Sequence, residues 1–369
     1  MRADVPSAVA AAIERCAGPA LVFDGERLAR NLTALAAAAR GAGVTALFAA
    51  KSFPHPAVRA LAAATLDGFD AASPGEVDEL PPARVLSVVD PTGRAGARGA
   101  EVARRWGARL IVGCETPAQV AAAPAGADIA LRLSASATGR DPAIGAVLDG
   151  TGHRRSRFGV DVERSARVAA VRAMVAAAAG RPVGLHVHHG PVTATSPERF
   201  LVTAREALAI AADAGLAPRF LDLGGAWHGL ADVAAALGVV RAAVPADIEV
   251  IIEPGRLVTS EAGFACGRVV VARALDDRAL RVVDLSRICH LRWSPVELVG
   301  AAPHPGEGTG VLVVGPTCFE DDVLGEWTVP PGALAEGDRV IVRHVTGYAV
   351  AWNTRFGGVP AADVVVTGA

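Results

Sequence analysis

The sequence predicts a (β/α)₈ barrel of the TIM type followed by a C-terminal β-sandwich or β-barrel domain. At 369 residues the chain is too long for one typical domain, so two are expected. Between about residues 45 and 256, eight short apolar runs alternate with alanine-rich stretches that are long enough for helices. After Arg256 the pattern changes to short strands separated by Pro/Gly turns. A doubly wound open sheet is the alternative to the barrel.

The eight apolar runs are the expected barrel strands, because strands buried on both faces are short and apolar throughout. Helices are expected between them, for example over Val160–Ala179 and Pro197–Ala214. Pro56 is placed in a first helical turn, and Gly41 and Gly215 are placed where helices end. The eight runs are Ala46–Ala50, Gly68–Ala72, Arg84–Val89, Arg109–Val112, Ile129–Leu133, Val183–Val187, Phe220–Leu223 and Ile248–Ile252.

The remainder of the chain predicts the β-domain. Val269–Ala274 and Leu280–Leu285 flank an Asp276-Asp277 turn and therefore predict a hairpin. Pro19–Phe23 is expected to pair with the C-terminal strands, before a helix over Arg27–Arg40. The domains are thus residues 25–257 for the barrel, and residues 1–24 with 258–369 for the β-domain. Its other strands are expected at Gly310–Val314, Glu326–Val329, Arg339–Val345 and Asp363–Val366.

Composition excludes several classes of function. The net charge is −2 and no basic block stands out, so neither nucleic acid nor an anionic membrane is an expected partner. The apolar stretch near Val168–Ala179 is interrupted by Arg172 and is too short to span a bilayer. No signal peptide is apparent at the start. The five cysteines lack metal-ligand spacing, which predicts reduced thiols, a cytoplasmic protein and no metal site.

Lys51 is the only lysine in this chain, although lysine and arginine together number 36. Arginine stays protonated at any working pH, whereas a desolvated lysine amine loses its proton and attacks a carbonyl carbon. Lys51 is therefore a candidate Schiff-base lysine. The alternative is compositional drift from lysine to arginine, which explains the loss of the other lysines but not the retention of this one.

Polar residues follow the predicted barrel strands where barrel enzymes place their chemistry, at the C-terminal ends. His188 alone is more typical of a buried core histidine, and a glycine pair alone is a routine turn. Their arrival on one rim together with Lys51 indicates a site for pyridoxal phosphate, a phosphate-bearing aldehyde. Backbone N–H groups at the glycines and an arginine suit phosphate, and a carboxylate suits the pyridine nitrogen. The rim residues are Lys51, Asp70, Arg132, His186, His188, His189, Gly224, Gly225, Glu253, Gly255 and Arg256.

These segments give the sequence a resemblance to the fold-type III pyridoxal phosphate-dependent decarboxylases, the ornithine, diaminopimelate and carboxynorspermidine decarboxylase group with an alanine racemase-type barrel. The resemblance covers nearly the whole chain, in the family's order. Glu253-Pro-Gly-Arg together with Gly315-Pro-Thr-Cys318 is the specific combination. The other matching segments are Phe48–Ser52, Gly68–Glu76, Ser156–Gly159, Gly184–Gly190, Leu221–Gly225, the continuation to Asp322, and Gly347-Tyr348.

The resemblance implies decarboxylation of an amino acid to an amine, with pyridoxal phosphate held by Lys51 as a Schiff base. It implies that His188 stacks on the pyridine face and that Glu253 pairs with the ring nitrogen. Asp70 and Arg132 match positions that line the cofactor pocket, as does Glu76. The implied phosphate-binding residues are Gly224, Gly225, Gly255, Arg256 and Tyr348, the chain's only tyrosine.

Cys318 matches the residue that reaches the partner protomer's site and returns a proton to the carbanion. The resemblance therefore implies a homodimer whose active sites are shared across the interface. An amino-acid racemase on the same fold is one alternative. Glu253 argues against it, because a racemase benefits from a weaker electron sink. A non-catalytic cofactor-binding paralogue is the other alternative.

Departures from the family pattern concern phosphate binding and the substrate. Pro191 replaces a common serine, and Ala226 replaces the third glycine of the usual run. Phe319 stands where relatives place an acid that reads the far end of the substrate, and Asp322 is retained. Arg292 is a candidate for reading a distal acidic group, with a solvated loop arginine as the alternative. A small-molecule substrate that is a non-standard or specialised-metabolism amino acid is therefore expected.

Overall fold

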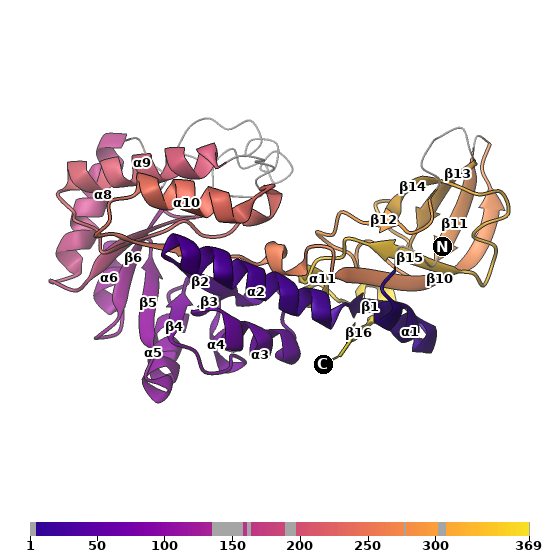
Figure 1. The fold of residues 1–369 in the computed structure, drawn as a ribbon, viewed down its shortest axis with the longest axis horizontal. Helices are drawn as coiled ribbons and strands as arrows, with labels where there is room; N and C mark the ends of the chain where they lie inside the picture. Colours follow the sequence, from indigo (N-terminus) through magenta and orange to yellow (C-terminus); the bar gives the residue numbers. More distant parts are fainter. Residues whose placement is uncertain are drawn as a thin grey trace. The chain divides into compact units, whose positions relative to one another are not determined.

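A computed structural model describes residues 5–134, 158–160, 164–188, 197–276, 278–301 and 308–368. By internal contacts the chain divides into two compact units (Figure 1). The barrel unit comprises Leu32–Lys51 and Arg59–Leu257, and the strand-rich unit comprises Met1–Asn31, Ser52–Val58 and Val258–Ala369. The domain limits expected from sequence stay a prediction, since helix α2 (Gly25–Ala42) runs through both units.

The barrel unit contains the predicted closed parallel barrel. Each strand pairs in parallel with the next strand of the chain, and β2 pairs with β9 through Val44 and Val250, which closes the ring and excludes the open sheet. Every predicted barrel strand is present within one to two residues at either end. The strands are β2 (Val44–Ala49), β3 (Gly68–Ala71), β4 (Val85–Val88), β5 (Arg109–Cys114), β6 (Asp128–Ser134), β7 (Val183–His188), β8 (Phe220–Asp222) and β9 (Glu249–Ile252).

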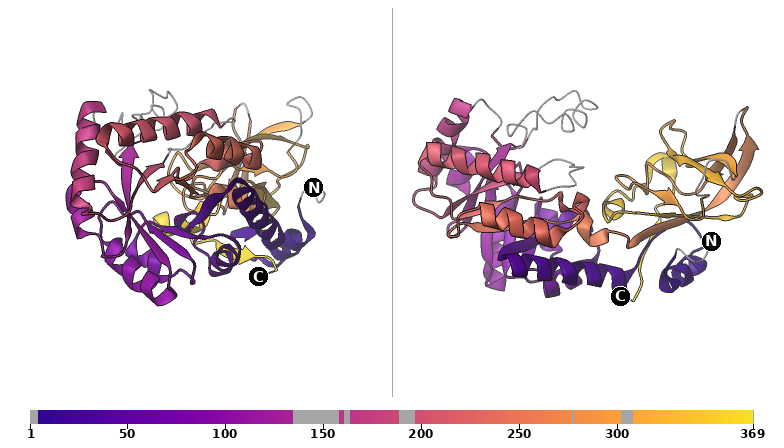
Figure 2. Two further views of the ribbon diagram at one scale, coloured as in Figure 1. Left: turned by 60° about the vertical axis from the view of Figure 1, so that its left-hand side comes forward. Right: turned by 45° about the horizontal axis from the view of Figure 1, so that its top comes forward.

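Helices cover the outside of these strands (Figure 2). Pro56 begins α3, and Gly215 ends α9 with φ of 73°, as expected for a proline in a first turn and a glycine after a helix. The expectation that Gly41 ends its helix is wrong: α2 continues to Ala42, and Gly43 follows with φ of 69°. The helices are α3 (Pro56–Thr65), α4 (Pro74–Asp78), α5 (Ala95–Trp106), α6 (Pro117–Ala122), α8 (Arg164–Ala177), α9 (Glu198–Ala214) and α10 (Val233–Ala243), with 3₁₀ turns η1 (Ala50–Ser52), η3 (Trp227–Gly229) and η4 (Arg256–Thr259).

Side chains fill the barrel interior, so the barrel is a packed core. Phe220 is fully buried in a cluster with Leu47, Ile111, Ala130 and Ile251, which come from four other strands. Burying a side chain of this size contributes about 1.5–3 kcal/mol. The core therefore fixes the strand ends, from which the candidate site projects.

The strand-rich unit is built on one sheet, with β1 (Ala20–Phe23) pairing antiparallel to β10 (Gly263–Ala274) and parallel to β16 (Asp363–Val366). The predicted hairpin is confirmed as β10 and β11 (Ala279–Val283). The remaining elements are β12 (Glu297–Leu298), β13 (Thr309–Val314), β14 (Val323–Val329), β15 (Arg339–Arg343), α11 (Tyr348–Ala351) and η5 (Phe356–Gly358).

An N-terminal helix, α1 (Ser7–Arg15), was not expected from sequence. Its buried Val9 and Ile13 belong to a core cluster with Val22 and Phe264 of the sheet. The described residues contain no helix with the length and apolar character needed to cross a bilayer.

Candidate active site

Lys51 lies at the C-terminal end of the barrel strands, in the 3₁₀ turn that follows β2. The register of β2 and β3 sets Ala49 beside Asp70, and the Lys51 Nζ atom lies 2.6 Å from Asp70 Oδ2. The Asp70 side chain is fully buried, whereas that of Lys51 is 40% exposed. A buried carboxylate thus holds an amine that remains accessible from the barrel mouth.

Glu76 lies in the first turn of α4, next to this pair, and Ser73 caps that helix. Ser73 Oγ accepts a hydrogen bond from the Glu76 N–H at 3.2 Å, and Glu76 Oε2 accepts one from the N–H of Ala72, the residue before the cap, at 2.7 Å. Burial raises the pKa of Glu76 despite that backbone hydrogen bond and the nearby Lys51. Its clearest role is to fix the loop after β3.

Arg132 lies within β6 and is mostly buried. Its Nη1 is 3.8 Å from Glu115 Oε1, and its guanidinium carbon lies 4.7 Å from the centroid of the Phe158 ring. The ring and the carboxylate hold the guanidinium in place at the end of this strand.

His188 ends β7 and contacts the glycine pair that follows β8. The Gly225 N–H donates to His188 Nδ1 at 3.1 Å. A Cβ atom on Gly224 would lie 2.5 Å from the same nitrogen, so the imidazole approaches this closely only because the residue is glycine. Gly224 and Ala226 have φ of 62° and 72°. Ala226, which departs from the family pattern, therefore adopts a left-handed conformation that favours glycine.

Glu253 follows β9 and is buried together with His186, which the sequence placed on the rim without a role, and with Asp222, which the predicted site residues did not include. Polar atoms of His186, Asp222 and Glu253 all lie within 4.8 Å of one another. Burial raises the pKa of Glu253 well above its ordinary value, and burial raises that of Asp222 to about 7. Burial likewise lowers the pKa of His186 well below its ordinary value, helped by Arg132.

The signal for His186 was its spacing of two from His188, which places both on one face of a strand. Asp222 lay inside the predicted apolar run Phe220–Leu223, but nothing in the sequence shows that β7, β8 and β9 bring these three groups together.

The turn Glu253–Arg256 packs beside β2, where the Ala49 N–H donates to the Pro254 oxygen at 3.3 Å. Arg256 is half-buried at the start of η4. Burial lowers the pKa of His228, and the charge of Arg256 lowers it further, so these two side chains interact electrostatically. His189, Gly190 and Pro191 lie outside the described residues.

The remaining predicted site residues belong to the strand-rich unit. Cys318 is exposed in the turn between β13 and β14. Phe319 is 51% exposed, and its ring packs edge-on against Phe356 at 6.2 Å. Asp322 is buried, and its carboxylate accepts hydrogen bonds from Ser286, Arg287 and Thr317.

Aromatic side chains surround two further predicted residues of this unit. Tyr348 packs edge-on against Trp293 at 5.3 Å, and Trp293 packs edge-on against Trp352 at the same distance. The Arg292 guanidinium lies over the Trp352 ring at 4.5 Å. Arg292 is thus placed by stacking, with its charge in an exposed position.

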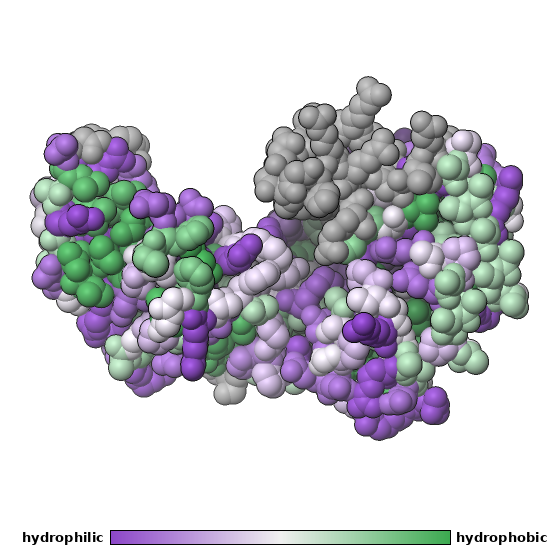
Figure 3. Space-filling model, turned by 180° about the vertical axis from the view of Figure 1, so that it is seen from behind, coloured by the Kyte–Doolittle hydropathy of each residue, from purple (hydrophilic) through white to green (hydrophobic). Residues whose placement is uncertain are grey.

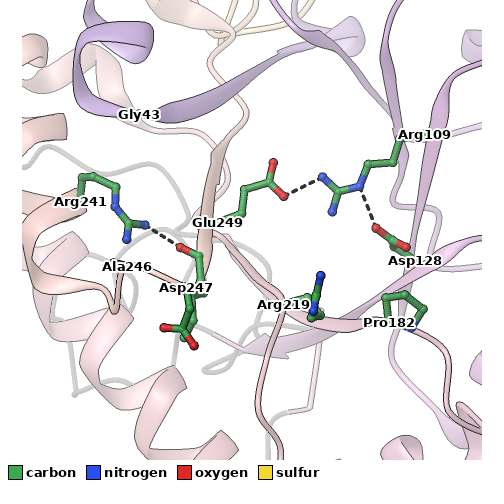
Figure 4. A pocket seen from close by; sticks show the side chains of 10 residues that line it. Gly43, Arg109, Asp128, Pro182, Arg219, Arg241, Ala246, Asp247 and Glu249 are labelled. Atoms are coloured by element: carbon green, nitrogen blue, oxygen red, sulfur yellow. Dashed lines mark hydrogen bonds and ion pairs between the residues drawn. The ribbon is translucent and has the colours of Figure 1, made fainter.

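A cavity of about 630 Å³ opens at the opposite, N-terminal end of the barrel strands (Figure 4). Arg109 pairs there with Asp128 at 2.7 Å and with Glu249 at 2.6 Å. Glu249 begins the strand that Glu253 follows, so this cavity is separated from Glu253 by the length of β9. Its charged groups tie strands together at the end of the barrel that serves stability.

Comparisons with known proteins give relatives of one kind, although no family model matches the chain. The diaminopimelate decarboxylase of Vibrio cholerae is 25% identical over 238 residues, covering 59% of this chain and 55% of that enzyme. The lysine/ornithine decarboxylase of Selenomonas ruminantium is 25% identical over 382 residues, covering 96% of this chain and 90% of that enzyme.

Solved structures share the fold over almost the whole chain. The lysine/ornithine decarboxylase of Vibrio vulnificus, complexed with putrescine, matches with a TM-score of 0.76 at 21% identity, over 98% of this chain and 97% of that one. The Selenomonas ruminantium lysine decarboxylase, in complex with pyridoxal phosphate and cadaverine, matches with a TM-score of 0.73 at 23% identity, over 97% and 92%. At these identities the structures establish the two-part fold.

Proposed function

We propose that this chain, a relative of the fold-type III pyridoxal phosphate-dependent decarboxylases, is itself an amino-acid decarboxylase that uses this cofactor. The observation that carries the proposal is the placement of the chain's only lysine. Its amine is exposed at the barrel mouth, 2.6 Å from a fully buried carboxylate.

The residues of the barrel unit fit the cofactor. Among the described residues, Glu253 Oε1 is buried without a hydrogen-bond partner, as expected of a group that a protonated ring nitrogen would satisfy. Lys51 would bind the aldehyde carbon, and His188 would lie against the ring. Phosphate would be held by the backbone around the glycine pair, by Gly255 and Arg256, and by Tyr348, while Asp70 and Arg132 would line the pocket.

Bound pyridoxal phosphate supplies a sink for the electron pair that remains when carbon dioxide departs. Asp70 keeps the Lys51 amine at the mouth, and the Glu253 carboxylate would hold a proton at the ring nitrogen of the bound cofactor. Cys318 Sγ would return a proton to the carbon that lost the carboxylate. Apolar walls that exclude water would favour loss of the charged carboxylate.

The active assembly in this proposal is a homodimer with shared sites. Hydrophobic surface gathers over the strand-rich unit (Figure 3), and among the described residues seven of the nine exposed large hydrophobic side chains belong to it. Exposed apolar groups concentrated on one unit are typical of an interaction surface. The seven are Val270, Val271, Leu275, Trp293, Phe319, Val323 and Phe356.

The substrate in this proposal is a non-standard amino acid. Phe319, which takes the place of an acid, is exposed and packs against Phe356, so the surface beside Cys318 is apolar. Asp322, the other acidic candidate in this turn, is already engaged by hydrogen bonds of its own chain. A substrate with a simple cationic end would find little charge complementarity there. Arg292 is exposed and is a candidate for binding an acidic group.

The test uses Lys51→Ala, with Lys51→Arg as the matched control that keeps a positive charge beside Asp70. The wild-type chain should retain a yellow chromophore and, after borohydride reduction, gain the mass of the cofactor at Lys51. Both variants should lack the covalent mass. A covalently bound chromophore in either variant would refute the assignment of Lys51.

The reaction is tested by incubating the wild-type chain with a broad amino-acid pool and identifying amine products by mass spectrometry, while released carbon dioxide is measured. Decarboxylation of one amino acid is expected. A change of optical rotation without carbon dioxide release would instead show a racemase, and no turnover with bound cofactor would indicate the non-catalytic paralogue.

A further inference from the structure

Two buried carboxyl groups lie close together at the C-terminal ends of β8 and β9. Asp222 ends β8 and is 2% exposed, and Glu253 follows β9 and is 5% exposed. Oxygen atoms of the two carboxyl groups lie within 4.8 Å of each other. Two ionised carboxylates this close in a buried site repel each other, so a proton shared between them is favoured.

The surrounding backbone ties the Asp222 carboxyl group and the Glu253 main chain to one residue, Gly224. The Gly224 N–H donates to Asp222 Oδ1 at 2.8 Å, and the Glu253 N–H donates to the Gly224 oxygen at 2.8 Å. Trp227 Nε1 donates to the same oxygen at 2.9 Å. The pair is therefore part of the loop that carries the glycine pair.

His186 completes the buried group from β7. Its Nε2 lies 3.7 Å from Glu253 Oε2, and within the described part of the chain neither ring nitrogen has a hydrogen-bond partner. A charged imidazole would be costly at a site that is 1% exposed, so the neutral ring is favoured. His186 thus supplies no full charge to hold both carboxylates ionised.

We propose that Asp222 and Glu253 share one proton, and that Asp222 is a positioning residue that sets the charge and orientation of Glu253 toward the cofactor's ring nitrogen. The positioning role of Asp222 rests on the proposed function. The shared proton concerns the chain alone. The charged and titratable groups that act on the pair and on His186 are Asp70, Lys51, Arg132 and His188.

Proton sharing predicts a distinct pH dependence of folding. An unfolded carboxyl titrates near pH 4, whereas burial raises the pKa of Asp222 in the folded chain to about 7. Over this window the folded chain binds one more proton than the unfolded chain. The contribution of the pair to stability is complete below about pH 4 and is lost as the pH rises, by about tenfold in the folding equilibrium constant per pH unit.

The first experiment measures urea unfolding of the full cofactor-free chain by circular dichroism between about pH 4 and pH 7. In Asp222→Asn and in Glu253→Gln, the remaining carboxyl group faces a neutral amide and has no second carboxylate with which to share a proton. Both variants should therefore lose the one-proton part of the pH dependence of the free energy of unfolding. Asp321→Asn, at an exposed acid, should keep it. If the free energy of unfolding of both variants depends on pH as steeply as that of the wild type, the proposal of a shared proton is overturned. If Asp222→Asn does not fold, Glu253→Gln carries this test alone.

The second experiment follows the absorbance of bound cofactor against pH in wild type and in Asp222→Asn. A displaced spectral titration is expected, because the charge of Glu253 would change, and an unchanged titration would overturn the positioning role.

Metal analysis of the same preparations is the third measurement. Stoichiometric metal would overturn the proposal, since a cation among these groups would displace the proton. Failure to bind cofactor would contradict the proposed function while leaving the first experiment intact.

Discussion

The Asp322 carboxylate shows how one buried charge can hold an exposed thiol in place. Its oxygens accept hydrogen bonds from Thr317 Oγ1 at 2.7 Å and the Thr317 N–H at 3.1 Å, and from the Arg287 N–H at 2.7 Å. Ser286 Oγ donates to both of its oxygens. Asp322 thereby ties the turn that carries Cys318 to the segment after β11. A substrate contact at Asp322 stays a prediction, and this bonding favours a scaffolding role.

Asp322→Asn should destabilise the chain by about 1–3 kcal/mol, because the amide replaces one acceptor with a donor among groups that all donate. Urea unfolding measures this loss. Asp321→Asn, at the exposed neighbour, is the control and should change the free energy of unfolding by less than about 0.5 kcal/mol. Equal stability of the two variants would contradict the scaffolding role.

In the proposed reaction, Cys318→Ala should still release carbon dioxide but yield less of the correct amine, because the proton would be delivered to the wrong atom or by water. The ratio of amine to carbon dioxide, which is one in a faithful reaction, measures this. Cys318→Ser tests whether an acidic thiol is needed or only a proton donor of similar size. An unchanged amine yield in Cys318→Ala would remove the thiol from the reaction.

At the scale of elements, close approach between β3 and β4 depends on a missing side chain. A Cβ atom on Gly68 would lie 1.9 Å from the Val85 backbone oxygen, which belongs to the neighbouring strand. Backbone atoms cannot move aside as a flexible side chain can. This contact therefore fixes the position of β3, which carries Asp70.

Gly68→Ala is expected to cost about 1–3 kcal/mol through this overlap. The matched control is Gly41→Ala, in helix α2, where an added Cβ has no neighbour within 4 Å. That control should stabilise the chain by about 0.5–1 kcal/mol, since alanine favours helix over glycine. Thermal or urea unfolding of both variants would show whether the two changes have opposite signs.

The elements that sequence predicted well are those whose composition follows from burial alone. Barrel strands such as Val183–His188 are buried almost throughout, so their sequences are short runs of mostly apolar residues. Helix α1 was missed because its apolar residues contact the sheet through tertiary packing that no local pattern reveals. Asp222 was missed for a related reason: its importance arises from its proximity to Glu253, 31 positions away, at the ends of two adjacent strands.

At the scale of the whole molecule, the proposed shared active sites predict that two defective variants complement each other. In the proposed dimer Lys51 and Cys318 of one site come from different protomers. A mixed dimer of Lys51→Ala and Cys318→Ala protomers therefore has one site with both defects and one site with none.

Co-expression of differently tagged variants, followed by tandem purification, isolates the mixed dimer. The mixed dimer should form the correct amine at about half of the wild-type rate. A preparation in which equal amounts of the two variants exchange subunits freely should reach about a quarter of that rate, because half of its dimers are mixed. Sedimentation gives the oligomeric state of each preparation. A mixed dimer that forms the correct amine no faster than the mean of its two parents would mean that each protomer builds its own site.

The pairing of β1 has a consequence for synthesis on the ribosome. Ala20 is paired with Cys266, 246 positions later, and with Asp363 beyond that. At about 5–20 residues per second, β1 waits on the order of 12–50 s for its first partner. The eight barrel strands, which pair with their neighbours in chain order, emerge completely in that interval. During translation β1 is thus an unpaired apolar strand, and a chaperone that shields such segments is expected to bind this nascent chain near its amino terminus.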